Sequence, residues 1–449
     1  MGNEINNNQE LQSNLKGYIL FWFGQLISLL GSSIIQFVLI WWVTVITADP
    51  VYLSLAAFIG FAPMIILTPL AGVLVDRYSR KLMIGTADFL QAVITVVLLF
   101  LFRNGTANLT IVLVFLGFRG VFQAFHTPSI QALIPIMIPR KHLNRFNSVD
   151  FLLNSLIFLI GPLVGAVLYA NFQMSLILSI DAITFLIAVI PLFFIAIPKI
   201  AKQVGEKARK ASFFAEFKEG VLFIRKKKGL LSLLSVFTAA NLFIMPLFIL
   251  INLFVFSNHS GTEIHLAYVL AFNQAGTIAG SILFIFWKGF KKKVVGVVLG
   301  IFVMYSGYLI VTLTPTSVFW FMGIGFLIIG FALPVANISS QTIWQSVVPK
   351  EKLGRVMSVR ITIAQITGPV GMLVSGFIAK AITIEYLFIS CVILGILFLA
   401  ISWFFTSIKK VEDDIDYDSE DEPTTEIEDQ SIEPFTDKEI ETPITTTKE

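Results

Sequence analysis

The sequence predicts an all-α membrane protein with twelve transmembrane helices in two pseudo-symmetric six-helix bundles. Three observations predict this fold: an apolar composition, twelve apolar runs of spanning length, and a pattern that recurs in the two halves. Of the 449 residues, 56% are hydrophobic and 14% are charged, and the mean hydropathy is +0.83. Charged residues make up about 25% of soluble domains, so this composition excludes a soluble globular protein.

Apolar runs of spanning length recur twelve times along the chain. A helix needs about 20 apolar residues to cross the hydrocarbon core of a bilayer, and each run reaches roughly this length. An even number of spans places both termini on the same side. The predicted spans cover residues 15–45, 51–75, 82–102, 108–134, 147–170, 174–197, 230–256, 264–287, 294–313, 317–346, 356–380 and 385–407.

The charges in the loops predict the direction of the spans. One side of the predicted membrane carries 26 Lys and Arg residues in its loops and beside the first and last spans, and the other side carries two, Arg103 and Lys380. Cytoplasmic loops of membrane proteins carry an excess of Lys and Arg. We therefore predict a multi-pass protein of the cell membrane with both termini in the cytoplasm.

A repeat relates the two halves of the chain. Five residues after the fourth span return 210 positions later, after the tenth, and Gly161-Pro162 returns 207 positions later as Gly368-Pro369. Two six-helix bundles explain both matches, and transporters built from parallel repeats place a site between them near the bilayer midplane. The five residues are Pro139, Leu143, Arg145, Ser148 and Val149, matched by Pro349, Leu353, Arg355, Ser358 and Val359.

The spans divide the chain into five parts. The central stretch holds ten Lys and Arg residues with apolar residues at helical spacing, which predicts an amphipathic helix on the anionic inner leaflet. A linker that only adheres to lipid and a regulatory or partner-binding segment are the alternatives. Residues 411–449 hold 16 Asp and Glu residues against two Lys, which is typical of a disordered, solvated tail. The parts are a cytoplasmic segment (1–14), an N-terminal bundle (15–197), a basic amphipathic linker (198–229), a C-terminal bundle (230–408) and an acidic tail (409–449).

A short charged loop joins the second and third spans. It reads Gly72-Val73-Leu74-Val75-Asp76-Arg77-Tyr78-Ser79-Arg80-Lys81, and its charges must pair because isolated charge at a membrane edge is expensive. The pattern resembles the cytoplasmic loop signature of the major facilitator superfamily of transporters, with Ser79 where that family usually has Gly. The resemblance implies a gating loop that latches the cytoplasmic ends of the two halves, against the start of the eleventh span near Arg355. Its residues are Gly72, Asp76, Arg77, Arg80 and Lys81.

Arg119 is the most central charge of the predicted spans. An arginine at a helix centre costs about 2.5–3.5 kcal/mol on insertion scales, so it needs a role. The segment Arg119-Gly120-Val121-Phe122-Gln123 resembles the fourth-helix motif of the superfamily, in which such an arginine is implicated in proton coupling, with Gln123 where Gly is usual. The alternative is an arginine held by helix carbonyls or by a neighbouring carboxylate. His126, beside Thr127-Pro128, is interpreted as a hydrogen-bonding residue at a helix kink, with a proton relay as the alternative.

Three carboxylates within the predicted spans are candidates for carrying a proton. A proton carrier needs a carboxylate whose pKa is raised by burial. Asp88 and Asp181 lie on the third and sixth spans, which are peripheral in the predicted fold, so helix–helix contacts are the alternative for both. Asp150 lies near the start of the fifth span, where Arg145 or Lys141 is an alternative partner.

Neutral amides mark the spans predicted to line the central cavity. The first, fifth, seventh, eighth and tenth spans carry Gln or Asn side chains, although an amide can also serve only to join helices. A cavity of amides and aromatic rings with little fixed charge favours a bulky amphiphilic or lipophilic solute over a sugar phosphate or a dianion. The predicted substrate pathway comprises Gln25, Gln36, Asn154, Asn241, Asn273, Asn337 and Gln341, together with Arg119.

A glycine- and proline-containing segment of the fifth span favours export. Gly161-Pro162-Leu163-Val164-Gly165 resembles the core of the antiporter motif of drug–proton exchangers, in which Pro kinks the helix and Gly allows close helix approach. Ile157 and Ala166 stand where the full motif has Gly. Residues 23–28, 125–128, 181–185 and 217–220 further resemble the drug:proton antiporter group that contains macrolide efflux proteins.

These resemblances imply a secondary active transporter that exports hydrophobic or amphiphilic small molecules, such as macrolides, by proton antiport with alternating access. A siderophore or lysolipid exporter, a nutrient symporter on the same scaffold and, more distantly, a non-transporting membrane receptor are the alternatives. No Walker-type loop, Gly-x-Ser-x-Gly motif or metal-spaced cluster indicates an enzyme or a cofactor, and the single Cys391 excludes an intramolecular disulfide. The expected partners are the small molecule, protons and the bilayer; we expect no nucleic acid, no metal and a monomer.

Overall fold

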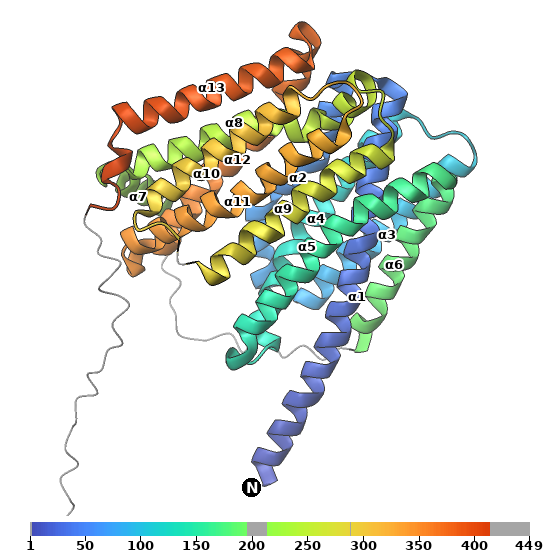
Figure 1. Cartoon of the computed structure of the whole chain (residues 1–449). Coiled ribbons are helices and arrows are strands. Elements are labelled where there is room, and N and C mark those ends of the chain that lie inside the picture. The colour runs from blue at the N-terminus through green and yellow to red at the C-terminus, as the bar shows by residue number, and fades with distance from the viewer. Residues whose placement is uncertain (1, 195–212, 288, 414–449) are drawn as a thin grey trace, which may run out of the picture. The chain divides into compact units, whose positions relative to one another are not determined.

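The computed structural model describes residues 2–194, 213–287 and 289–413. Twelve helices in this part of the chain are long and apolar enough to cross a membrane, which confirms the predicted all-α fold (Figure 1). The first half contains α1 (Gly2–Thr47), α2 (Pro50–Arg77), α3 (Arg80–Arg103), α4 (Leu109–Met137), α5 (Arg140–Asn171) and α6 (Met174–Phe194). Helix α7 (Phe213–Lys226) precedes the second half, which contains α8 (Leu230–Leu253, continued by a π-helical turn at Phe254–Asn258), α9 (Glu263–Phe286), α10 (Lys293–Thr312), α11 (Phe319–Val347), α12 (Lys350–Ile382) and α13 (Ile384–Phe405).

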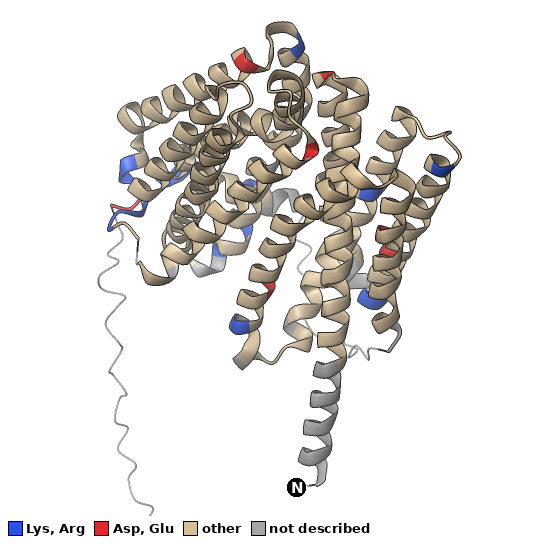
Figure 2. Ribbon diagram, turned by 45° about the vertical axis from the view of Figure 1, so that its right-hand side comes forward, with Lys and Arg blue, Asp and Glu red and all other residues tan. Residues whose placement is uncertain are grey.

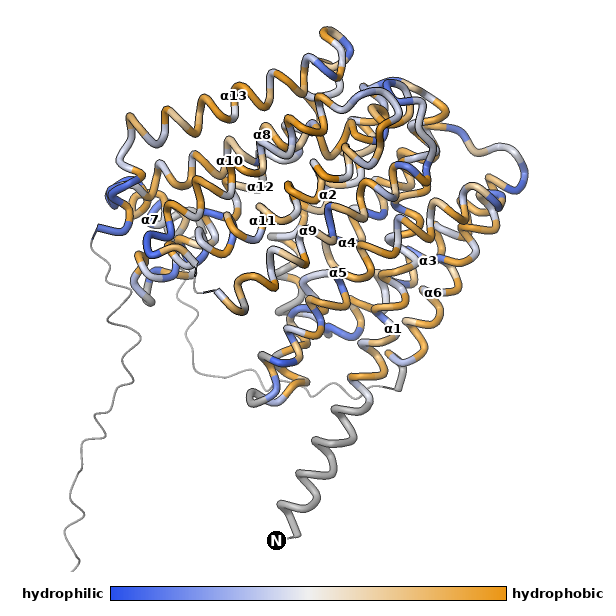
Figure 3. The backbone as a smooth tube through the Cα atoms, viewed as in Figure 1, coloured by the Kyte–Doolittle hydropathy of each residue, from blue (hydrophilic) through white to orange (hydrophobic). Residues whose placement is uncertain are grey.

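The distribution of polar residues follows the requirement that a spanning helix satisfies its own backbone in lipid. Apolar residues cover the helices along their length, and hydrophilic residues gather toward the helix ends (Figure 3). Most Lys and Arg residues likewise lie near those ends (Figure 2). Large apolar side chains such as Phe286, Phe404 and Phe405 are exposed at 72–85%, which suits a surface that faces acyl chains.

Local signals in the sequence set where the helices begin. The Asp49 carboxylate accepts a hydrogen bond from the Val51 N–H at 2.8 Å, and Pro50 occupies the first helical position of α2. The Asn108 side chain caps α4 by accepting from the Ile111 N–H at 3.0 Å. Both caps satisfy N–H groups that the first turn of a helix leaves without partners.

Small residues allow the helices of the second half to approach closely. A Cβ atom added to Gly330 of α11 would lie 1.9 Å from the Asn273 carbonyl oxygen of α9, and one added to Gly276 of α9 would lie 2.1 Å from the Leu327 carbonyl oxygen of α11. Both clashes are with backbone, which cannot rotate away. Glycine at these positions is therefore required by packing, as is common where membrane helices associate without a hydrophobic driving force.

Among the described side chains, polar contacts join the two halves at one end of the helices. This far end carries the α1–α2, α8–α9 and α12–α13 connections, and the opposite, linker end carries α7. The Lys380 Nζ donates to Asp49 Oδ2 at 2.6 Å, and the Trp41 Nε1 donates to Glu263 Oε2 at 3.1 Å. One turn further in, the hydroxyls of Ser54 on α2 and Ser375 on α12 lie 3.3 Å apart. These contacts hold the far ends of the two halves together.

The basic linker contains a helix that packs on the second half. Residues 198–212 lie outside the described part of the chain, and α7 begins at Phe213. The Glu219 carboxylate accepts from Arg355 NH1 of α12 at 2.5 Å, and a Cβ on Gly220 would lie 2.7 Å from Val359 Cγ2. The amphipathic helix predicted for the leaflet surface thus uses one face against α12.

The second half extends a few residues beyond its predicted end at residue 408. A short 3-10 helix (Ser407–Lys410) is followed by Glu412, which is 6% exposed and accepts hydrogen bonds from the N–H groups of Lys293 and Val294 at 3.0 and 2.9 Å. A carboxylate at this position satisfies the first turn of α10 and its dipole. Residues 409–413 therefore belong to the helical body, and the rest of the acidic tail lies outside the described residues.

Candidate functional site

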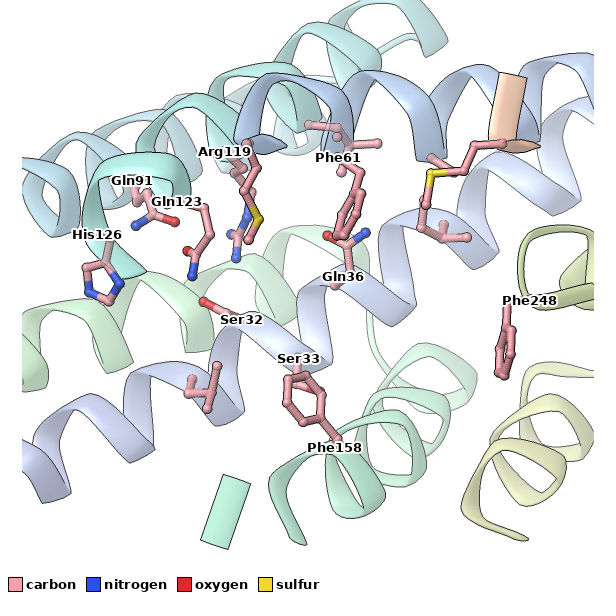
Figure 4. A pocket seen from close by; sticks show the side chains of 18 of the residues that line it. Ser32, Ser33, Gln36, Phe61, Gln91, Arg119, Gln123, His126, Phe158 and Phe248 are labelled. Atoms are coloured by element: carbon pink, nitrogen blue, oxygen red, sulfur yellow. The ribbon is translucent and has the colours of Figure 1, made fainter. Parts of the chain in front are cut away.

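A cavity of about 470 Å³ lies among the helices of both halves. Small-molecule sites usually measure roughly 300–1,000 Å³, so a small organic solute fits this volume. The second half contributes four residues: Phe248, Ile249, Asn252 and Met372. The first half contributes the polar wall, and Figure 4 shows the side chains of Gln91, Arg119, Gln123 and His126 gathered on one side of it. The polar lining from the first half is Gln25, Ser28, Ser32, Ser33, Gln36, Gln91, Arg119, Gln123 and His126.

Arg119 enters this cavity as half of a buried ion pair. Its NH1 group lies 2.8 Å from Asp181 Oδ2 of α6, and the same oxygen accepts from the Thr95 hydroxyl of α3 at 3.1 Å. Arg119 is 8% exposed and Asp181 is fully buried. The rings of Phe115 and Phe185 each lie 5.7 Å from the guanidinium carbon, a distance at which aromatic faces attract a cation. The alternative of an arginine held by a neighbouring carboxylate is therefore present in the structure.

A second polar cluster joins α1, α3 and α4. The Gln25 Nε2 donates to Asp88 Oδ2 at 3.0 Å, and the His126 Nε2 lies 2.9 Å from Asp88 Oδ1 and 3.1 Å from Gln25 Oε1. Asp88 is fully buried. His126 is a hydrogen-bonding residue, as predicted, and its partners are the side chains of Asp88 and Gln25 on two other helices. Asp88 and Asp181 do make the helix–helix contacts predicted as alternatives.

The two clusters lie along the same faces of two neighbouring helices. Asp88, Gln91 and Thr95 follow one another on α3 at spacings of three and four residues, which places them on one face. Arg119, Gln123 and His126 do the same on α4. The two ends of each stripe are seven residues apart, or about 10 Å at 1.5 Å per residue. A continuous polar strip thus connects the Asp88–His126 pair with the Asp181–Arg119 pair along the cavity.

Three of the predicted pathway residues line this cavity: Gln25, Gln36 and Arg119. Asn154 instead donates to the Asp150 carbonyl of its own helix, and Asn273 is buried and donates to the Phe326 carbonyl at 3.2 Å. Asn241, Asn337 and Gln341 line a separate cavity of the second half. The sequence placed these amides on the right helices, but it does not show which face of an apolar helix turns inward.

Of the other residues predicted from the sequence, Asp150 and the described residues of the gating loop lie outside the lining of the central cavity. The Asp150 carboxylate accepts a hydrogen bond from Trp22 Nε1 of α1 at 2.6 Å. Gly72, Asp76 and Arg77 belong to α2, and their side-chain surroundings are outside the described part of the chain. Arg80 and Lys81 begin α3. Arg355, near which this loop is expected to latch, contacts Glu219 of α7.

The antiporter-like segment packs α5 against the cavity-lining helix α1. A Cβ on Gly161 would lie 2.2 Å from the Ser33 hydroxyl oxygen, and one on Gly165 would lie 3.3 Å from the Ile34 carbonyl oxygen. Pro162 lies between them inside α5. These residues set how closely α5 approaches α1, and Ser33 on the facing turn lines the cavity.

Sequence reasoning missed two cavity residues, Gln91 and Arg360. Gln91 lies three residues after Asp88, and this spacing on a helix was the available signal. Arg360 of α12 is a cation within a span and lies on the wall of the separate cavity of the second half. The described residues contain no group of three or more His, Cys, Asp or Glu side chains placed to hold a metal ion.

Twelve spanning helices in two halves that share a cavity are the architecture of a membrane transporter. The chain belongs to the Major Facilitator Superfamily, whose family model matches residues 21–369 and 260–437. It is 30% identical over 375 residues to the macrolide efflux protein A of Streptococcus pyogenes, covering 84% of this chain and 92% of that one. It is 28% identical over 316 residues to the macrolide efflux protein A of Enterococcus faecalis, covering 70% and 97%.

Solved structures show the same fold. A bacterial homologue of the iron transporter ferroportin in an inward-facing state matches with a TM-score of 0.67 at 14% identity, covering 86% of this chain and 98% of that chain. A bacterial homologue of the human lysosomal transporter Spinster, inward-facing and unoccupied, matches with a TM-score of 0.63 at 14% identity, covering 87% and 95%.

Proposed function

We propose that this protein is a proton-coupled exporter of hydrophobic or amphiphilic small molecules, such as macrolides, in the cell membrane. The observation that carries the proposal is the neutral character of the shared cavity. Its one arginine is paired with Asp181, and the rest of its polar lining is His126 with serine hydroxyls and amides beside aromatic and aliphatic walls. Such a lining suits a lipophilic solute. The two macrolide efflux proteins to which the chain is similar support the same substrate class.

The positive charge of the linker end supports a cytoplasmic position for that end and for both termini. The far ends of the two halves are joined by Lys380–Asp49 and Trp41–Glu263, so in this orientation the external side is closed. Export then requires these contacts to separate. A proton entering along about 100 mV contributes about 2.3 kcal/mol, enough for roughly 50-fold accumulation of a neutral solute.

The test is uptake of a radiolabelled macrolide, erythromycin, by an efflux-deficient bacterial host that expresses the full chain. We expect lower steady-state accumulation than in the host with an empty vector, and loss of this difference when a protonophore collapses the proton gradient. A susceptibility panel of neutral, cationic and anionic compounds then defines the substrate range. Higher accumulation in expressing cells, or export that persists with the protonophore, would contradict proton-driven export.

The Asp49–Lys380 pair predicts how the external side responds to mutation. Asp49→Asn removes the charge that holds Lys380, so we expect the external ends to separate more often. The effect is about fivefold at most on the open-to-closed ratio, because solvent screens exposed pairs. The measurement is the distance distribution between spin labels at positions 104 and 316, which lie in far-end loops of the two halves. Asp49→Glu is the matched control, and an unchanged distribution in Asp49→Asn would argue against this latch.

The same pair fixes the expected pH dependence. Burial alone would raise the pKa of Asp49, but the hydrogen bond and charge of Lys380 and the N–H groups of Val51 and Tyr52 lower that pKa below its ordinary value. An Asp carboxylate whose pKa is lowered stays charged, and keeps its ion pair, at any pH above the ordinary Asp pKa of about 3.9. The ion pair is lost as the pH falls through the lowered pKa. We therefore expect no separation of the spin labels between about pH 8 and pH 5.

A further inference from the structure

A second cavity lies wholly within the second half and shares no lining residue with the central one. Its volume is about 250 Å³. It is formed where the beginning of α8, the end of α11 and the beginning of α12 meet, so it lies toward the linker end. Its walls are Leu234, Phe237 and Asn241 of α8, Asn337, Gln341 and Trp344 of α11, and Met357, Arg360, Ile361 and Ala364 of α12.

Arg360 is the only charged residue that lines this cavity among the described residues. Its NH1 group donates to the Gln341 amide oxygen at 2.5 Å, and its NH2 group lies 3.4 Å from the Ser340 hydroxyl. The Trp344 ring lies 5.5 Å from the guanidinium carbon and is 1% exposed. Arg119 of the first half has a carboxylate at 2.8 Å, whereas the described partners of Arg360 are all uncharged. A cation that is half-buried in a span without a counter-charge is costly.

The repeat shows that this charge is particular to the second half. At the 210-residue offset that relates Ser148-Val149 to Ser358-Val359, Arg360 corresponds to Asp150. Asp150 accepts a hydrogen bond from Trp22. The matching position of the other half thus carries the opposite charge and has its hydrogen bond satisfied by an indole. The common scaffold therefore does not demand an arginine at this position.

We propose that this cavity binds the anionic head of an amphiphilic molecule, a carboxylate or a phosphate, whose chain lies along the apolar wall. A guanidinium presents a planar fork of N–H donors that matches the oxygens of such a group. The amide of Gln341 can rotate to place its NH₂ group beside the fork, and the amides of Asn241 and Asn337 add neutral polar groups at the rim. Phe237, Ile361 and Met357 supply the surface for the chain. A cationic amine is repelled here, so this site and the neutral central cavity select different chemistry.

The test is binding of small probes to the purified full chain in nanodiscs of zwitterionic lipid, measured by isothermal titration calorimetry. The probes are octanoate and octyl phosphate, with acetate and inorganic phosphate as heads without a chain, and octanol and octylamine as chains without an anion. We expect saturable binding of octanoate and octyl phosphate, at least about tenfold tighter than acetate and inorganic phosphate because each buried CH₂ adds roughly fourfold. Comparable binding of acetate would show a simple ion site, and comparable binding of octanol or octylamine would show an apolar site; either result overturns the proposal.

Variants assign the binding to this cavity. Arg360→Gln should weaken octanoate binding by about tenfold or more, because a hydrogen bond to a charged group is lost. Arg360→Lys keeps the positive charge but lacks the planar guanidinium donors, so it is expected to bind octanoate with intermediate affinity. Intermediate binding would show that the weaker binding of Arg360→Gln comes from the lost donors and charge and not from misfolding. Arg225→Gln, on the exposed face of α7, is the matched control and should bind as the unaltered chain does. Equal affinity in Arg360→Gln would overturn the assignment. The measurement is of binding rather than transport, so its failure would leave the proposed export untouched.

Discussion

Replacing Asp181 by Asn is expected to destabilise the protein by about 3–5 kcal/mol and to abolish export. The substitution leaves Arg119 buried without its carboxylate, and an uncompensated buried charge carries a cost of this size. The aromatic rings of Phe115 and Phe185 attract the guanidinium, but they supply no counter-charge. Arg119→Gln is expected to have a similar effect for the same reason, because it leaves Asp181 fully buried with only Thr95 as a described partner.

The double variant Arg119→Gln/Asp181→Asn separates the structural role of this pair from its functional role. It removes both charges while keeping similar shapes, so we expect most of the lost stability to return. Thermal unfolding in detergent measures the stability, and erythromycin accumulation in cells measures the export. A double variant that folds but does not export would show that the charges serve transport. A double variant that folds and exports normally would show that the pair serves only to hold α4 against α6. If either single variant, Asp181→Asn or Arg119→Gln, is as stable as the unaltered chain, the expected loss of stability from an unpaired buried charge is contradicted.

The sequence predicted the helices well because the bilayer imposes a simple rule on them. A spanning helix must be apolar over about 20 residues, and this requirement is visible without any knowledge of packing. Arg119 could be singled out for the same reason, since a charge interrupts an apolar run. The partner of Arg119 could not be predicted in this way, because Asp181 lies 62 residues away and the pairing depends on how α4 and α6 pack.

Inward-facing residues were harder to predict than spans. In a soluble helix the polar face marks the outside, but lipid and protein interior are both apolar, so the sequence gives no comparable contrast. Asn273 looked like a cavity residue and instead satisfies the Phe326 carbonyl beside the close α9–α11 contact. His126 looked isolated because Asp88 and Gln25 lie on other helices. Arg360 was overlooked because cations near the start of a span are common.

Neutralising Asp88 is expected to uncouple export from the proton gradient. Asp88 and His126 form the second buried pair of the polar strip, and His126 lines the cavity itself. The His126 Nε2 and Asp88 Oδ1 atoms are 2.9 Å apart, so a proton can pass between them. Asp88→Asn removes the acceptor charge but can still accept from Gln25, so we expect a folded protein that binds substrate and has lost active accumulation.

Two transport assays in proteoliposomes distinguish loss of coupling from loss of transport. Under an imposed proton gradient, Asp88→Asn should lose the concentrative export of labelled erythromycin, a loss of up to about 50-fold if one proton moves across about 100 mV for each molecule exported as its uncharged amine. Exchange of labelled for unlabelled erythromycin needs no net proton movement, so it should persist in the same variant. His126→Gln should behave alike, because it removes the other half of the pair. Asp413→Asn removes an exposed carboxylate outside the spans and should leave both assays unchanged. Concentrative export that survives in both Asp88→Asn and His126→Gln would exclude this pair as the proton site and leave Asp181 as the other fully buried carboxylate.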